Sequence, residues 1–140
     1  LRLPLIGLAR SFALLCEPEG LPDERQKACR RLFEAVSQEP FYTSGHGRLP
    51  LALMQALPGR IWAKNGAEGI FAVGLPGGIG MAVKIDDGAD RGYEAIVIEA
   101  LMDLGVLKDL PESLERFHRS PVHNTQGREV GEVIAARRLA

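Results

Sequence analysis

The sequence predicts an α+β fold, in which an antiparallel sheet of about four strands is flanked by helices. The first observation is a change of hydrophobic period near residue 59: residues 1–57 repeat apolar side chains at helical spacing, and short strand-like runs follow. The second is that the connections between these runs are shorter than the dozen or so residues that a parallel crossover needs. We therefore expect antiparallel hairpins within one unit that spans residues 1–140.

The first half of the chain predicts three helices, over residues 4–16, 22–40 and 49–57. Proline stands at the start of the first two segments, where its missing N–H is not needed and its fixed φ suits a helix. Apolar residues recur on one face of each segment. Residues 43–47, which are rich in glycine and small polar side chains, are expected to form a loop.

The second half predicts strands over residues 60–64, 69–75 and 79–85. Pro76-Gly77-Gly78 is typical of the turn between the last two of them. Residues 129–135 alternate between apolar and polar side chains, and we expect them to join the same sheet as its last strand.

One long helix is expected after the third strand, over residues 90–104. Asp90 is suited to its N-cap and Gly105 to its C-terminus, and its apolar stripe is suited to cover one face of the sheet. Residues 106–128 are expected to be mostly loop, with one short helical turn.

Composition excludes several classes of partner. The net charge of −1 leaves no excess of positive charge that would attract nucleic acid or an anionic membrane. No apolar run reaches the roughly 20 residues of a membrane span. Cys16 and Cys29 fall inside helical patterns, which favours a reducing cytoplasm over a disulfide framework. No cysteine or histidine stands at ligand spacing, so no metal site is expected in this chain.

The stretch Ala63-Lys64-Asn65-Gly66-Ala67-Glu68-Gly69 places a lysine at the end of the first predicted strand, directly before a glycine-containing turn. Most lysines are exposed, so a solvated strand end is the ordinary interpretation of Lys64. The layout is, however, similar to the Lys-Thr-Gly element of serine β-lactamases and penicillin-binding proteins, in which a strand-end lysine faces a nucleophilic serine. Lys64 is therefore a candidate catalytic residue.

A closer resemblance covers residues 3–135. The chain resembles the C-terminal part of the L-asparaginase II family, the Rhizobium-type asparaginases, and four motifs carry the resemblance. They are Leu3-Pro4-Leu5 with Leu8-Ala9-Arg10; Ala63–Gly69 with Leu75-Pro76; Ala82-Val83-Lys84-Ile85-Asp86-Asp87-Gly88; and Pro121-Val122 with Asn124, Gly127 and Val130-Gly131-Glu132.

The resemblance implies an amidohydrolase with a serine β-lactamase-like fold that converts L-asparagine to aspartate and ammonia. It implies a serine nucleophile activated by a lysine, because a hydroxyl needs a neighbouring base to attack an amide. Lys64 matches that lysine. Asn65, Gly66, Glu68 and Asp86 are the expected substrate-binding residues beside it.

Structural roles remain open for several of these residues. Glu68 is equally suited to be an exposed hairpin residue. Asp86-Asp87-Gly88 is also typical of a plain turn before a helix, and Lys84 could pair with either aspartate.

Two features depart from the family pattern. No serine of this chain has a lysine three residues later, so the nucleophile and the family's zinc site are expected N-terminal to Leu1, and this chain alone is expected to be inactive. Pro50-Leu51 stands where the family has a polar Asp-Thr pair, which affects the contacts of that loop. The alternative function is a non-catalytic binding or assembly module that keeps a penicillin-binding-like fold. The family also suggests a homodimer.

Overall fold

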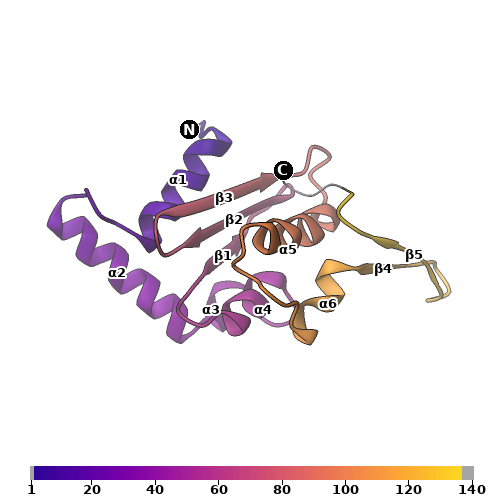
Figure 1. Cartoon of the computed structure of the whole chain (residues 1–140). Coiled ribbons are helices and arrows are strands. Elements are labelled where there is room, and N and C mark those ends of the chain that lie inside the picture. The colour runs from indigo at the N-terminus through magenta and orange to yellow at the C-terminus, as the bar shows by residue number, and fades with distance from the viewer. Residues whose placement is uncertain (1, 137–140) are drawn as a thin grey trace.

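The computed structural model describes residues 2–136 and has an α+β architecture (Figure 1). Four helices precede the central sheet: α1 (Leu5–Cys16), α2 (Asp23–Gln38), α3 (Phe41–Ser44) and α4 (Leu49–Ala56). The sheet follows, with strands β1 (Trp62–Asn65), β2 (Ile70–Leu75) and β3 (Ile79–Lys84). The C-terminal elements are the 3-10 turn η1 (Asp90–Gly92), α5 (Tyr93–Asp103), α6 (Glu112–His118), β4 (Ser120–His123) and β5 (Glu129–Val133).

The three predicted hairpin strands are confirmed. They form an antiparallel sheet of order β1-β2-β3, in which Lys64 lies opposite Ala72 and Ala72 opposite Ala82. Because side chains alternate along a strand, this register sorts them into two faces. Trp62, Lys64, Ala72 and Ala82 share one face, and the residues between them share the other.

The hydrophobic core lies on the second face of the sheet. There, Phe71 and Val73 of β2 are fully buried against α4, α5 and α6. The ring of Phe71 packs against that of Tyr93, at the start of α5, with centroids 5.0 Å apart and the rings tilted by 42°. The expectation that the helix after β3 covers one face is therefore confirmed, although Asp90 belongs to a 3-10 turn and makes no side-chain cap.

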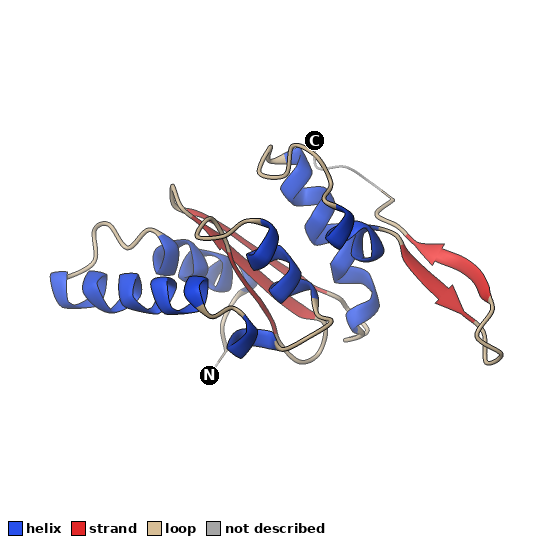
Figure 2. Cartoon of the chain, turned by 90° about the horizontal axis from the view of Figure 1, so that it is seen from below, coloured by secondary structure: helices blue, strands red, loops and turns tan. Residues whose placement is uncertain are grey.

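Helix α1 packs on the first face, so that α1 and α5 lie on opposite sides of the sheet (Figures 1 and 2). This packing is close because Gly74 and its partner Gly80 have no side chain: a Cβ on either would collide with the carbonyl oxygen of Phe12 or Ala9. Phe12 also meets Trp62 edge to face at 5.9 Å. Small residues thus fix α1 over one half of this face.

The expected pairing of the C-terminal strand is wrong. Strand β5 pairs with β4 in a separate two-stranded sheet, and this hairpin projects away from the body (Figures 1 and 2). Residues 106–128 contain the expected short helical segment, the seven-residue helix α6, but also the strand β4, where a loop was expected. The predicted loop at 43–47 begins inside the short helix α3. In the described part of the chain, no helix is long and apolar enough to cross a membrane.

Candidate functional site

The two motifs that the sequence singles out meet at one end of the central sheet. The β1–β2 turn over residues 66–69 closes with a hydrogen bond from Gly66 N to Ile70 O, at 2.8 Å. Ile85, which follows β3, donates its N–H to Gly69 O at 2.9 Å and joins this turn to the loop over residues 85–89. A Cβ on Gly69 would stand 2.9 Å from Ile85 Cβ and 3.0 Å from Ala89 O. The two loops are therefore in direct contact.

Lys64 lies at this end on the sheet face that α1 partly covers. Its Nζ donates a hydrogen bond to the backbone carbonyl of Asn65 at 2.8 Å, and its side chain is exposed. Among the residues that the structure describes, no ion pair involves Lys64. The ammonium group is thus held near the strand end and is accessible to a ligand.

Asn65 points to the opposite face, as the alternation of the strand requires. It is only 8% exposed, and a hydrogen bond from its side chain favours the ionised form of Tyr93. Burial nevertheless dominates and raises the pKa of Tyr93, with the carboxylates of Asp90 and Glu94 adding to the effect. Lys64 and Asn65 are therefore adjacent in sequence but do not share a face: Asn65 reaches the lysine side of the sheet through its backbone carbonyl.

Glu68 has a left-handed backbone with φ 60°, which is uncommon for a residue other than glycine. Its Oε2 lies 2.7 Å from the place that a Cβ on Gly88 would occupy, so its carboxylate lies over the backbone of the second loop. Asp86 is exposed in that loop. Its neighbour Asp87 accepts the Ala89 N–H at 2.9 Å and pairs with Arg91. The structure thus brings Lys64, Gly66, Glu68 and Asp86 to one end of the sheet.

Gly69→Ala tests the contact between the two loops. We expect it to lower the free energy of unfolding by about 2–3 kcal/mol, since the added methyl meets Ile85 and the Ala89 carbonyl at a left-handed backbone. Gly59→Ala is the matched control: its φ of 69° is also positive, but nothing lies within 4 Å. We expect the free energy of unfolding of this control to fall by about 1 kcal/mol, measured by urea unfolding. Equal losses in the two variants would mean that the loop contact contributes nothing.

The family resemblance implies a zinc site outside this chain, and the residues that the structure describes do not fit one. Among the described residues, no group of three His, Cys, Asp or Glu side chains could hold a metal ion. Cys16 is buried against the sheet, and burial raises its pKa to about 12, so its thiol is not a ready thiolate ligand. Cys29 lies on a different helix and is free.

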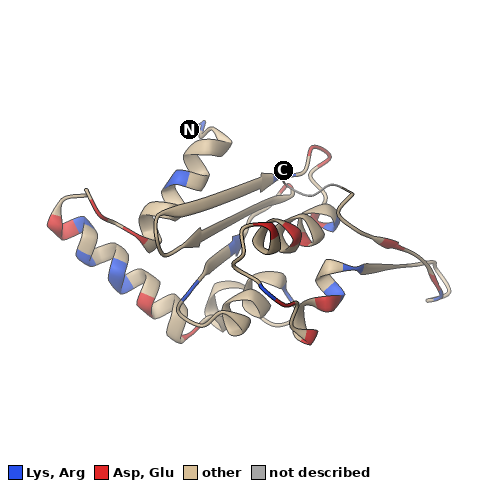
Figure 3. Ribbon diagram, in the orientation of Figure 1, with Lys and Arg blue, Asp and Glu red and all other residues tan. Residues whose placement is uncertain are grey.

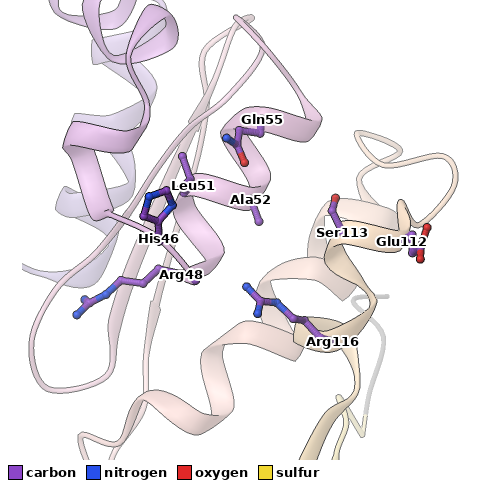
Figure 4. Close-up of a pocket in the computed structure, with 9 residues that line it drawn as sticks. His46, Arg48, Leu51, Ala52, Gln55, Glu112, Ser113 and Arg116 are labelled. Atoms are coloured by element: carbon purple, nitrogen blue, oxygen red, sulfur yellow. The ribbon is translucent and has the colours of Figure 1, made fainter.

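Sequence reasoning missed the hollow between α4 and α6, which has a volume of about 380 Å³ (Figure 4). Arg116 of α6 extends toward α4, while Arg48 points away on the far side. None of the predicted site residues lines this hollow. Sequence reasoning also missed Tyr93. A tyrosine within the apolar stripe of a helix does not indicate that its hydroxyl is buried beside an asparagine.

The fold and this sheet end define a class: an α+β protein that presents a lysine and two carboxylates where two tight loops meet. The chain belongs to the L-asparaginase II family, whose profile matches residues 1–135. No curated protein matches the chain. Membership supports an asparaginase-type hydrolase function in general, with a small-molecule substrate.

Proposed function

We propose that this chain is the lysine-bearing part of an amidohydrolase that converts L-asparagine to aspartate and ammonia. The observation that carries the proposal is the placement of Lys64, in a chain of this family, at an open strand end beside the contact of the 66–69 and 85–89 loops. A rigid strand presents the amine, and the glycines of the turn keep side chains away from it.

The proposed chemistry is acyl transfer through a serine. The serine oxygen attacks the carboxamide carbon, and its proton passes to the side-chain nitrogen of Lys64. When the tetrahedral intermediate breaks down, the C–N bond is cleaved and the lysine returns the proton to the leaving ammonia. Water then hydrolyses the acyl ester and releases aspartate.

We propose that the nucleophilic serine lies outside these 140 residues, since no serine here is followed by a lysine at the third position. The serines of the described chain also lie on elements other than β1: Ser11 is on α1, Ser37 is in the last turn of α2, Ser44 ends α3, Ser113 is on α6 and Ser120 begins β4. The site would then be completed by a segment that packs on the Lys64 face of the sheet.

The test compares the 140-residue chain with the whole protein that the gene encodes, by ammonia release from L-asparagine. We expect turnover from the whole protein and none from the 140-residue chain, because the chain lacks the serine–lysine pair. Turnover by the chain alone near the ~10 s⁻¹ typical of enzymes would contradict the proposal.

The alternative is a binding or assembly module that keeps the fold without the chemistry. The absence of a Ser-X-X-Lys pair in this chain is the observation in its favour. The coding sequence before Leu1 separates the two: a Ser-X-X-Lys element and a Cys-Ser-Gly-Lys-like segment there would support the enzyme, and their absence would support the module.

A further inference from the structure

A second lysine lies on the same face of the sheet as Lys64. In the strand register, Lys64 is opposite Ala72, Ala72 is opposite Ala82, and Lys84 is opposite Ile70. All of these side chains point to one side, because residues that are opposite each other, or two apart on a strand, share a face. Lys64 and Lys84 therefore stand on the two outer strands, on either side of a strip made by Ile70, Ala72 and Ala82.

Both ammonium groups lie at the same end of the sheet. Strands β1 and β3 run in the same direction, since each is antiparallel to β2. Lys64 Nζ donates to the carbonyl of Asn65, and Lys84 Nζ donates to the carbonyl of Ile85, the residue that follows each lysine at its strand end. The other half of this face, at Gly74 and Gly80, is the half that α1 covers. Between the two lysines, Ala72 is buried, whereas Lys64 and Lys84 themselves are exposed, so both amines are accessible at the margins of this face.

Lys84 has no acidic partner in the part of the chain that the structure describes. The sequence left open a pairing with Asp86 or Asp87, but Asp87 pairs with Arg91, and no ion pair or hydrogen bond joins Lys84 to a carboxylate. The central strands β1, β2 and β3 contain no acidic residue, and the acidic side chains lie on helices, on loops and on β5 (Figure 3). Lys84 is a cation held in place by a backbone carbonyl and open to an anionic group.

We propose that Lys84 binds the carboxylate of the substrate, as a specificity-determining residue of the site that contains Lys64. This inference rests on the proposed function and names the substrate class: a zwitterionic amino acid amide. An ammonium group is a strong, adaptable point-charge donor to a carboxylate. Glu68 and Asp86 lie at the same sheet end and are suited to the α-ammonium group of the same ligand. In this proposal, Lys64 accepts the proton of the nucleophile and Lys84 binds the carboxylate of the substrate.

The test uses the whole protein that the gene encodes, with L-asparagine and with L-asparagine methyl ester, which lacks the free carboxylate. We expect Lys84→Ala to raise KM for L-asparagine about 10- to 100-fold while kcat changes by less than about threefold, because the lost charge-assisted bond is made equally in the ground state and the transition state. For the methyl ester, which has no carboxylate to bind, we expect KM and kcat to stay nearly unchanged. Lys84→Arg is expected to retain most of the affinity. Lys27→Ala, on the exposed surface of α2, is the control and should change neither constant.

Binding of L-aspartate by calorimetry separates this inference from the proposed function, because it needs no turnover. A protein that releases ammonia, but whose Lys84→Ala variant keeps the wild-type KM and aspartate affinity, would overturn the carboxylate role and leave the function intact. A protein without turnover whose aspartate binding is weakened about tenfold or more by Lys84→Ala would support the carboxylate role and overturn the function.

Discussion

Replacing Lys64 with alanine is expected to lower the turnover of the whole protein by about 10²–10⁴, while the melting temperature stays nearly unchanged. The loss is large because a group that accepts the serine proton disappears from the transition state. Stability is spared because the exposed lysine makes one hydrogen bond to the Asn65 carbonyl and no ion pair among the described residues. The measurements are ammonia release from L-asparagine and thermal unfolding followed by circular dichroism.

Lys64→Arg distinguishes proton transfer from simple charge. A guanidinium group keeps the positive charge but stays protonated, so we expect no rescue at this position. Lys27→Ala again controls for the loss of an exposed lysine. If either Lys64 variant retains turnover near that of the wild type, Lys64 is a solvated strand end and the chemistry lies elsewhere.

Gly80→Ala and Gly74→Ala are expected to produce the largest losses of stability in the chain. At either position, a methyl group would collide with a backbone carbonyl of α1, which can yield only if the helix moves off the sheet. We expect each to lower the free energy of unfolding by about 3 kcal/mol or more, and the melting temperature by on the order of 10 °C.

The matched control is Gly131→Ala in β5. Gly131 also has an ordinary strand backbone, and nothing lies within 4 Å of its added methyl, so we expect a change within about 0.5 kcal/mol. Urea unfolding of the 140-residue chain measures all three variants. A Gly80→Ala variant as stable as the control would mean that α1 does not pack on β3 in solution.

Local patterns predicted the central sheet and its covering helix. Short connections exclude a parallel crossover, and the turn at Pro76-Gly77-Gly78 sets the β2–β3 register, so these strands could be derived from neighbouring residues alone. The pairing partner of β5 could not be derived in this way. Strand β4 is four residues long and contains Pro121, which lacks an N–H, so its residues carry no strand pattern. Without a visible partner nearby, the alternation over residues 129–135 predicts the wrong sheet.

For the candidate site, the sequence identified the two loops but not how they meet. The contact of Glu68 with Gly88 depends on three strands that return both loops to the same sheet end, which is a tertiary property. The sequence also grouped Lys64 with Asn65, although adjacent strand residues point to opposite faces. A pairing of Lys84 with Asp86 or Asp87 stays open at the level of sequence, because the competing Asp87–Arg91 pair becomes visible only in the structure.

The projecting β4–β5 hairpin leaves one backbone edge of each strand free to pair with a foreign strand, which in other proteins is a route to aggregation. Its composition counters that hazard. Pro121 removes a donor from β4, and the charged side chains of Glu129 and Glu132 flank the exposed Val130 on β5. A bulge between Val122 and His123 further disturbs the regular spacing that a foreign strand would need. The hairpin can therefore extend into water and still resist the edge-to-edge association that its exposed valines would otherwise promote.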